Sequence, residues 1–477
     1  MQHREQWVPH EYQRKAIRFA VKNSAAALLL DLGMGKTGIA ASTFIALKKA
    51  GVVNRALVIA PRRPCYSVWS NERYGELGRW ENFSDIKISL LHGRHKEDAL
   101  EEEADLYVIN FEGIKWLLES GGLRTRWARD IDMLIVDELS KFKHPRSQRF
   151  KLMRPHLGRF KRRLGLTGSP ASNGLIDLFG QMYVVDQGET LGRYITHYRH
   201  KYFVPSGFGG YTWKLQDGAE EKIRAAIKPH SLSMRAKDHL DMPMLVERDI
   251  WVDLPDKAAR IYHDIEEEFF ALIDDQTVTA VNAAVASGQC RQVASGSLYK
   301  PIPMGEPKLT AKRQVIKIHD AKIEALKDLV EEMQGSPLLV AYSFDHDYQS
   351  ICDGLGYTVP ALRGGTSDKV ASKIIAEWNA GEIPVLCGHP AAMGHGLNLQ
   401  QSGNHICWYS LTWDYELYVQ LNGRVYRQGS KAKRVFIHRL LARNTIDEAV
   451  ASAIVKKGRV QDTLLDSLRR YRAERRR

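Results

Sequence analysis

The sequence predicts an α/β protein with two doubly wound parallel-sheet domains and a mostly helical insert between them. Short aliphatic runs alternate with stretches of helical periodicity through residues 25–180, and the alternation returns from residue 311 onward. The runs are continuous, which is typical of strands that helices cover on both faces of a parallel sheet. Between the two regions the β-branched runs disappear, and aromatic, glycine-containing and helical stretches replace them. The expected parts are domains at 1–180 and 311–457, an insert at 181–310 and a basic tail at 458–477.

The individual elements follow from the same patterns. In the first domain we expect helices at 13–21 and 38–50, and strands at 25–30, 56–60, 106–110, 133–136 and 163–166. In the insert, residues 257–273 have a helical pattern. In the second domain we expect strands at 337–341, 357–362, 383–386, 404–409 and 435–439, separated by helices at 322–333, 345–355, 368–380 and 415–422. Loops at the carboxyl ends of such strands are where open α/β sheets bind ligands.

A glycine-containing loop joins the first strand to its helix in the sequence AAALLLDLGMGKT, residues 25–37. Gly33 and Gly35 allow a tight bend that brings backbone N–H groups close to phosphate oxygens. Lys36 can place its charge on the β- and γ-phosphates, and Thr37 can offer a hydroxyl to Mg²⁺. The helix that follows directs its positive end at the nucleotide. The full phosphate-loop pattern is not met, because leucine holds its first glycine position, and short matches also occur in ordinary strand-to-helix turns.

Two carboxylates end the fourth strand of the first domain. Four apolar residues, 133–136, deliver Asp137 and Glu138 to the strand end, which is unfavourable unless a cation lies there. Asp137 is well placed to hold Mg²⁺ through water, and Glu138 to orient and deprotonate an attacking water. An acidic strand end can also be a helix N-cap, but the phosphate loop earlier in the chain favours the catalytic interpretation.

Several further positions in this domain have two interpretations each. Thr167 and Ser169, which follow the fifth strand, can hydrogen-bond toward the acidic pair and sense the nucleotide, or form a simple turn. The amide of Gln13 has the donors and the acceptor needed to read an adenine edge, or it faces solvent. Arg62 and Arg63 follow the second strand, where they can hold a nucleic-acid phosphate or belong to a solvated basic turn.

Two segments of the second domain are candidates for contact with phosphate. Residues 394–399 form a glycine-rich turn after a strand. Residues 420–427 contain Arg424 and Arg427, which share one face if the segment is helical. Two guanidiniums on one face could reach a γ-phosphate from the opposite domain, an effect worth about 10³–10⁵ in the rate of phosphoryl transfer. The alternative is a solvated basic face.

Composition favours an intracellular protein with a polyanionic partner. The net charge of +13 indicates nucleic acid first and an anionic membrane surface second, with a merely basic surface as the alternative. Six arginines among residues 469–477 would add non-specific phosphate affinity or solubility. The five cysteines lie far apart, so we expect a reducing compartment with neither disulfides nor zinc. We recognise no signal peptide and no apolar run near the ~20 residues of a membrane span, so we expect no membrane partner.

The ordered set of motifs resembles that of helicase superfamily 2 motors, most closely the Swi/Snf-type DNA translocases in the compact form of phages and bacteria. The resemblance covers roughly residues 8–457. Its first half rests on Pro9–Gln13, which is similar to the adenine-reading Q motif, and on Asp31–Thr37, Ala60-Pro61 with Trp69 and Glu72, Asp137-Glu138 and Leu166–Pro170. Leu232–Pro243 and Arg291-Gln292 are similar to two segments that separate this family from other superfamily 2 motors. The later motifs are Val340–Phe344, Met393–Leu399, Gln420–Gln428 and Thr445–Glu448.

The resemblance implies two RecA-like domains that hydrolyse ATP with Mg²⁺ and move along double-stranded DNA, with single-stranded DNA or RNA as alternatives. It implies the catalytic residues Lys36, Asp137, Glu138, Arg424 and Arg427; the nucleotide-binding residues Gln13, Gly33, Met34, Gly35, Lys36, Thr37 and Gly38; and the Mg²⁺ ligands Thr37 and Asp137. For nucleic acid it implies Pro61, Arg62, Phe111, Ser343, Gly364, Gly396 and Trp413, and for coupling Thr167, Ser169 and Gln420. We expect a monomer in the bacterial cytoplasm or nucleoid, or in a phage-infected cell, that works in recombination, repair or replication.

The chain departs from the family pattern at several motifs. Its acidic box reads Asp-Glu-Leu-Ser, with Ser140 at the histidine position of the family, so the coupling of hydrolysis to DNA can differ. Residues 413–415 read Trp-Asp-Tyr rather than Trp-Asn-Pro, and residues 429–430 read Gly-Ser rather than Gly-Gln. None of these departures removes a group needed for hydrolysis. Two rival functions stay open: a strand-separating DNA or RNA helicase, and a non-enzymatic nucleic-acid-binding scaffold with a vestigial ATP site.

Overall fold

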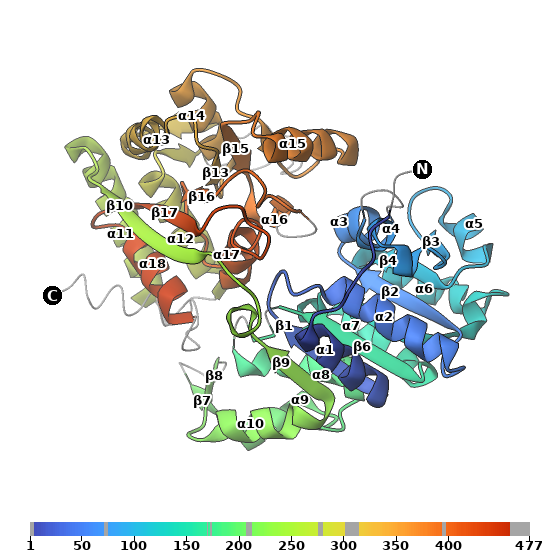
Figure 1. Cartoon of the computed structure of the whole chain (residues 1–477). Coiled ribbons are helices and arrows are strands. Elements are labelled where there is room, and N and C mark those ends of the chain that lie inside the picture. The colour runs from blue at the N-terminus through green and yellow to red at the C-terminus, as the bar shows by residue number, and fades with distance from the viewer. Residues whose placement is uncertain are drawn as a thin grey trace. The chain divides into compact units, whose positions relative to one another are not determined.

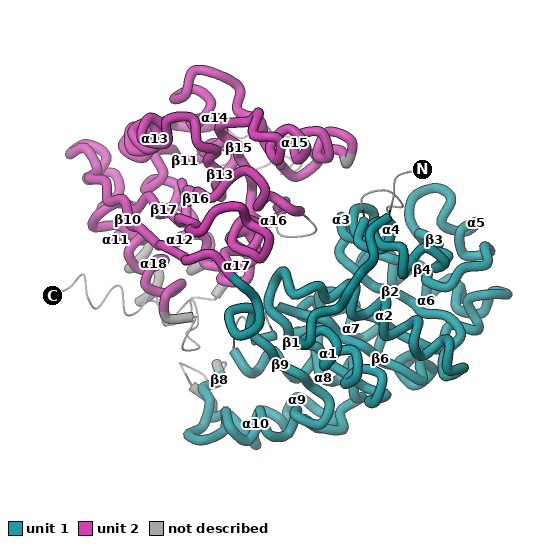
Figure 2. The backbone as a smooth tube through the Cα atoms, viewed as in Figure 1, with its two compact units in different colours: residues 1–241 teal, residues 242–477 magenta. Residues whose placement is uncertain are grey.

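The chain folds as two compact units, Met1–Asp241 and Met242–Arg477 (Figure 1 and Figure 2). The structure is a computed structural model that describes residues 4–70, 75–168, 170–171, 174–206, 212–274, 280–300, 314–393 and 397–457. The division differs from the expected one, because the segment 181–310 is not a separate body. Its first part supplies a strand to the sheet of unit 1, and its later part supplies a strand to the sheet of unit 2.

Unit 1 is built on a seven-stranded sheet in the order β3-β4-β2-β5-β6-β1-β9, in which every neighbouring pair is parallel. The strands are β1 (Ala25–Leu30), β2 (Arg55–Ala60), β3 (Ile88–Leu90), β4 (Leu106–Asn110), β5 (Ile131–Asp137), β6 (Arg162–Thr167) and β9 (Ser231–Met234). All six residues of β1 are buried. Because α1 and α8 both pack against β1, a continuous aliphatic sequence is required there, and the sequence supplies it.

The helices of unit 1 are α1 (Glu11–Lys22), α2 (Lys36–Lys49), α3 (Arg62–Pro64), α4 (Glu76–Arg79), α5 (Lys96–Glu101), α6 (Ile114–Glu119), α7 (Gln148–Met153), α8 (Leu178–Asp186), α9 (Ile195–Tyr202) and α10 (Ala219–Ile227). An antiparallel hairpin of β7 (Phe203–Ser206) and β8 (Thr212–Leu215) lies between α9 and α10 in the chain. One face of the sheet contributes alternate residues, such as Ala27 and Leu29, to a core that includes side chains of α6, α7 and α8.

Unit 2 is built on a six-stranded parallel sheet in the order β10-β17-β16-β13-β15-β14. The strands are β10 (Met244–Val252), β13 (Leu338–Ala341), β14 (Ala361–Leu362), β15 (Val385–Gly388), β16 (His405–Trp408) and β17 (Arg434–Ala442), and β11 (Ser297–Tyr299) pairs with β12 (Val315–Lys317) in a separate hairpin. The helices are α11 (Asp256–Asp274), α12 (Ala280–Ala294), α13 (Ala321–Glu332), α14 (Asp345–Leu355), α15 (Asp368–Ala380), α16 (Pro390–Met393), α17 (Tyr415–Asn422) and α18 (Ile446–Lys457).

Both faces of the second sheet are covered. Leu339 and Ala341 of β13 belong to a core with side chains of α15, α17 and α18, whereas Leu338 and Val340 belong to a core with side chains of α13 and α14. The alternation of β13 between two cores is the pattern of a doubly wound sheet. The fold class predicted from the sequence is therefore confirmed.

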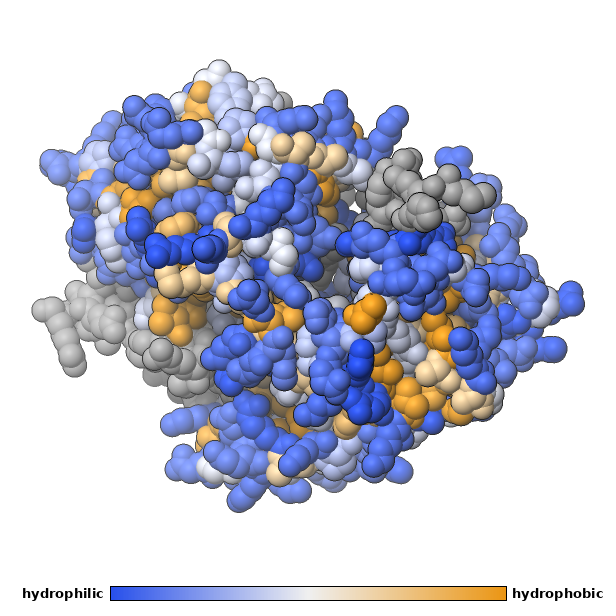
Figure 3. Space-filling model, viewed as in Figure 1, coloured by the Kyte–Doolittle hydropathy of each residue, from blue (hydrophilic) through white to orange (hydrophobic). Residues whose placement is uncertain are grey.

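Among the residues that the structure describes, no helix combines the length and the apolar character that crossing a bilayer needs. Hydrophilic residues cover most of the face seen in Figure 3, and the hydrophobic residues on it lie in small separate groups.

Candidate nucleotide site and arginine cluster

The loop between β1 and α2 has the geometry of a phosphate-binding loop. Gly33 and Gly35 have φ angles of 82° and 73°, a left-handed region that strains residues with a side chain. The ammonium of Lys36 folds back over the loop and donates to the carbonyl oxygens of Leu30 at 2.8 Å and Asp31 at 3.0 Å. The loop leads directly into α2, which begins at Lys36, so Thr37 and Gly38 lie in its first turn. This first turn carries backbone N–H groups without partners inside the helix, as an anion site requires.

Two side chains from α1 donate hydrogen bonds to the backbone of this loop at Met34. Tyr12 Oη and Gln13 Nε2 each donate to the carbonyl oxygen of Met34 at 3.2 Å. Gln13 Oε1 accepts from the backbone N–H of His10 at 2.8 Å, and the Gln13 side chain is buried. The alternative of a solvent-facing glutamine is therefore wrong for Gln13, because its amide packs on the loop. A Cβ built on Gly35 would lie 2.4 Å from Gln13 Nε2, so the glutamine approaches the loop as closely as glycine allows.

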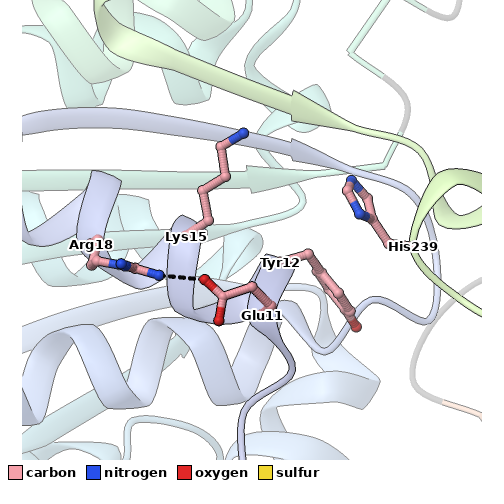
Figure 4. Close-up of a pocket in the computed structure, with 5 residues that line it drawn as sticks. All are labelled: Glu11, Tyr12, Lys15, Arg18 and His239. Carbon is pink, nitrogen blue, oxygen red and sulfur yellow. Dashed lines mark hydrogen bonds and ion pairs between the residues drawn. The ribbon is translucent and has the colours of Figure 1, made fainter.

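An open pocket of about 460 Å³ lies beside α1, lined by Glu11, Tyr12, Lys15, Arg18 and His239 (Figure 4). The rings of Tyr12 and His239 stack with their centroids 5.5 Å apart. Arg18 pairs with Glu11 at 2.6 Å, which leaves Lys15 as the cation of this group without a carboxylate partner among the described residues. Tyr12 thus connects the pocket to the loop, since its ring lines the one and its hydroxyl contacts the other.

The loop is also tied to β9, an element that the sequence did not reveal. Asp31 Oδ2 accepts from the backbone N–H of Ala236 at 2.8 Å, and the N–H of Asp31 donates to the carbonyl of Met234. The motif resemblance of 232–243 gave the signal that this segment matters. The pattern Ser-Leu-Ser-Met is too short and too polar to predict a strand, and only its pairing with β1 explains its position.

The carboxylates predicted at the end of β5 lie in a network of defined contacts. Asp137 accepts from the indole N–H of Trp69 at 2.9 Å. Glu138 is buried and has a φ of 70°, and its Oε1 accepts from Ser140 Oγ at 2.8 Å and from Thr167 Oγ1 at 3.4 Å. A left-handed glutamate is strained, so its conformation is held by surrounding contacts. The hydrogen bond from Thr167 to Glu138 is the contact predicted for Thr167. Ser140 is a second partner of Glu138, which the sequence did not predict.

Burial raises the pKa of Asp137 to about 6, and the negative charge of Glu138 acts in the same direction. The Trp69 hydrogen bond and the positive charge of Lys36 oppose this rise in pKa. The charges of Lys36 and Asp137 therefore interact at the strand ends, although the two residues are far apart in the sequence. Thr37 and Asp137 supply hydroxyl and carboxylate oxygens, the donor types that Mg²⁺ prefers. Among the described residues, no group of three or more histidines, cysteines or acidic residues could hold a metal by protein ligands alone.

In unit 2, the two segments predicted to face phosphate lie against each other. Arg424 is buried and its Nη1 donates to the carbonyl of Leu397 at 3.5 Å, and Arg427 Nη1 donates to Asn398 Oδ1 at 2.6 Å. The backbone N–H of Leu399 donates to the carbonyl of Arg424. The two arginines would share one face only on a helix, and that condition is not met: α17 ends at Asn422, and the arginines lie in the turns after it.

The other predicted residues of unit 2 take part in well-defined contacts. Gln420 is buried and donates to Glu416 Oε1 at 3.1 Å. Ser343 Oγ accepts from Arg291 Nη2 at 3.0 Å, and Arg291 also bonds the carbonyl of Leu411. This contact joins two of the recognised motifs around one half-buried arginine.

Trp413 donates from Nε1 to Ser287 Oγ at 2.9 Å. Gly364 is exposed, and a Cβ there would meet nothing within 4 Å.

The predicted nucleic-acid residues of unit 1 follow two neighbouring strands, β2 and β4. Pro61 is the N-cap of the short helix α3, which begins at Arg62, and Arg62 is exposed. Phe111 is buried in the main core, with the guanidinium of Arg149 5.5 Å above its ring. Ser169, Gly396 and Glu72 lie outside the described residues, as does the basic tail.

Comparison with known proteins gave two family matches. The profile of the SNF2-related domain matches residues 12–296, and the profile of the helicase conserved C-terminal domain matches residues 321–429. The chain is 31% identical over 480 residues to protein p41 of Acyrthosiphon pisum secondary endosymbiont phage 1, covering 97% of this chain and 99% of that protein.

More distant relatives and solved structures were also found. The Saccharomyces cerevisiae ISWI chromatin-remodeling complex ATPase ISW2 is 22% identical over 95% of this chain, which spans 40% of its length. The Gallus gallus DNA repair and recombination protein RAD54-like is 21% identical over 96% of this chain and 67% of its own length. The chain also spans less than half, 46%, of a Bacillus subtilis relative. The structure of the Sulfolobus solfataricus SWI2/SNF2 ATPase core in complex with double-stranded DNA is 20% identical, with a TM-score of 0.43 over 98% of this chain and 95% of that chain.

Proposed function

The chain belongs to the SNF2-related family of helicase-like ATPases, and from this we propose that it is a motor that moves along double-stranded DNA as it hydrolyses ATP. The observation that carries the proposal is the arrangement around the end of β5. Glu138 is buried in a strained conformation, held by Ser140 and Thr167, at the same sheet edge as the loop of Lys36. A glutamate fixed in this way suits a group that must accept a proton in one defined position.

We propose that the triphosphate lies on the loop 31–37. Lys36 would exchange its two carbonyl partners for β- and γ-phosphate oxygens, which are stronger acceptors for an ammonium. Gln13, already seated against the loop, would read the adenine edge. Thr37 and Asp137 would hold Mg²⁺, which neutralises charge on the phosphates when bound.

The chemical step would use Glu138 as the base. Its carboxylate would orient a water against the γ-phosphorus and take one proton from that water at the oxygen that Ser140 does not occupy. Thr167, which shares the same carboxylate oxygen, would move when the protonation or position of Glu138 changes. We infer that this hydroxyl passes the state of the nucleotide to the neighbouring loop.

Unit 2 would complete the site through Arg424 and Arg427. Both arginines donate hydrogen bonds to residues 397–398. A change in how this segment contacts DNA would therefore move the guanidiniums. Arginines that reach the γ-phosphate would stabilise the charge of the transition state. We propose that Arg291 has a positioning role in the same unit, because it holds Ser343 against the carbonyl of Leu411.

We propose that DNA is held through its phosphates by backbone groups near Pro61, Arg62, Phe111, Gly364 and Gly396, together with Ser343 and Trp413. The net charge of +13 supports a polyanionic partner, and phosphate contacts carry no sequence information, which suits a motor that tracks along any sequence. The one reported relative named for DNA repair and recombination supports a task in recombination, repair or replication.

The test is the rate of ATP turnover with double-stranded DNA, single-stranded DNA and RNA, each at saturating concentration. We expect double-stranded DNA to give the largest stimulation. Stimulation by single-stranded DNA or RNA alone would favour a strand-separating helicase. Binding of double-stranded DNA without any ATP turnover would favour the scaffold alternative.

A further inference from the structure

Two long stretches of unit 1 contain no acidic residue. Between residues 139 and 176 the chain has ten lysines and arginines and no aspartate or glutamate, and residues 190–216 are likewise free of acids. In a chain with 56 acidic residues among 477, such stretches are unusual, and the first of them places ten positive charges directly after the end of β5. The first stretch contains α7, and the second contains α9 and the β7–β8 hairpin.

Part of this charge is used inside the fold. Arg154 donates to Tyr183 Oη, Arg159 donates to three backbone carbonyls, and Arg163 donates to the carbonyls of Val185, Leu157 and Phe160. Lys161 pairs with Asp132 at 3.0 Å. These cations stabilise unit 1 and are not available for a ligand.

Arg149 and Arg199 are positioned differently, by contact with aromatic rings, and we call these two arginines together with Arg146 the three-arginine surface. The guanidinium of Arg149 lies 5.5 Å from the ring centroid of Phe111, and that of Arg199 lies 5.5 Å from the ring centroid of Trp213. Contact with a ring face positions a guanidinium without using its N–H donors. None of the three arginines has an ion pair among the described residues, and Arg199 Nε is buried without a hydrogen-bond acceptor there.

Contacts through α8 bring the segment of Arg146 close to the helix that carries Arg199. A Cβ on Gly180 of α8 would lie 2.2 Å from the carbonyl oxygen of Phe142, so the chain leading to Arg146 is pressed against this helix. The preceding residue of α8, Phe179, packs on Tyr198 of α9, with ring centroids 5.6 Å apart. Burial lowers the pKa of Arg199, and the positive charge of Arg146 lowers it further, which places the two guanidiniums within electrostatic reach of each other.

Two guanidiniums brought close with no carboxylate between them repel each other, and an anion removes that repulsion. We propose that the three-arginine surface binds phosphates of the DNA duplex, as a contact in addition to the residues predicted from the motifs. The proposal rests on the proposed function, and its place in the fold supports DNA as the anion. Phe111, beneath Arg149, follows β4 at the sheet edge where the nucleic-acid residues were predicted.

The experiment measures the affinity of the full chain for a double-stranded DNA fragment between 50 and 300 mM salt. A variant with Arg146, Arg149 and Arg199 changed to alanine is compared with a control in which Lys115, Arg129 and Arg224 become alanine. The control removes the same charge, but its three cations already pair with Glu119, Asp130 and Glu220. Each phosphate contact adds about 0.9 to the slope of log K against log salt, so the surface variant should lose roughly 2 to 3 units of slope.

The outcomes separate the two proposals. A reduced slope in the surface variant with an unchanged slope in the control supports the surface. Equal slopes in the surface variant and the unmodified chain, both of which bind DNA, would overturn the surface and leave the motor in place. No DNA binding by the unmodified chain would overturn the proposed function itself. If the surface variant loses binding to phosphatidylserine vesicles while its DNA slope is unchanged, the partner is a membrane and the proposal is wrong.

A second variant separates the loss of a DNA contact from the effect of misfolding. Arg146 is exposed and holds no other residue in place among those described, so Arg146→Glu alone should leave the thermal unfolding midpoint unchanged. It should still reduce the slope by about 1 unit. An unchanged slope in this folded variant would also overturn the surface.

Discussion

The contact between Gln13 and Gly35 allows a double-mutant test of how α1 controls the phosphate loop. Gly35 has a φ of 73°, so Gly35→Ala introduces left-handed strain of about 1–2 kcal/mol. The new methyl would also lie 2.4 Å from Gln13 Nε2 and push the amide away from the carbonyl of Met34. The lost hydrogen bond adds about 0.5–1.5 kcal/mol, because the displaced amide is buried.

In a Gln13→Ala background the cost of the lost hydrogen bond disappears, because no side-chain amide remains to be displaced. Gly35→Ala should therefore destabilise the loop by about 1 kcal/mol less in that background than in the unmodified chain. The assay is amide hydrogen exchange of the full chain, read as the opening free energy of peptides that cover residues 31–38.

Gly51→Ala is the matched control for backbone strain alone. Gly51 has a φ of 68°, and a Cβ there would meet nothing within 4 Å. Its effect should be the same with and without Gln13. If the effects of Gly35→Ala and Gln13→Ala are additive within about 0.3–0.5 kcal/mol, the claimed contact does not restrain the loop and the reasoning is refuted.

Three other predictions concern chemistry and stability. Glu138→Gln keeps an acceptor for its partners but no base, so ATP turnover should fall by about 10²–10⁴ while nucleotide affinity stays within a few-fold; comparable turnover would remove Glu138 from the mechanism. Arg427→Ala should lose DNA-stimulated turnover with little change in nucleotide affinity, and a large rise in the Kd for ATP would make it a binding residue instead. Burial lowers the pKa of His438 to about 4, and the neighbouring His405 acts in the same direction. Between pH 6.5 and 4, His438 is therefore protonated in the unfolded chain but neutral in the folded chain. This contribution to the free energy of unfolding is fully present above pH 6.5 and should fall by up to about 1.4 kcal/mol per pH unit as the pH drops. In urea unfolding, His438→Gln should show a weaker dependence on pH. An equal dependence in both proteins would contradict the prediction.

The strands that could be predicted are those buried on both faces. The aliphatic runs at 25–30 and 106–110 became β1 and β4 with the same bounds, because only continuous apolar residues fit between two helical layers. β10 was missed, since Glu247, Arg248 and Asp249 stand exposed in the middle of an edge strand and interrupt the pattern. Such a strand is defined by its pairing with β17 rather than by its own sequence.

The candidate site divides in the same way. Loop residues such as Lys36 and strand-end carboxylates such as Asp137 could be predicted, because local sequence fixes their positions. The Trp69 bond to Asp137 and the Ala236 bond to Asp31 could not, since each depends on tertiary contacts between distant segments. The helix predicted at 415–422 has the bounds of α17, and Gly423 closes it before Arg424 and Arg427.

The central claim is that hydrolysis at the Lys36 loop drives movement along duplex DNA. The most direct measurement is ATP-dependent displacement of a third strand from a triplex on double-stranded DNA, with Lys36→Ala as the comparison. We expect the unmodified chain to displace the third strand without separating the duplex, and the variant to leave it bound. Displacement of equal extent by both proteins, or none by an unmodified chain whose ATP turnover is stimulated by the duplex, would contradict the account.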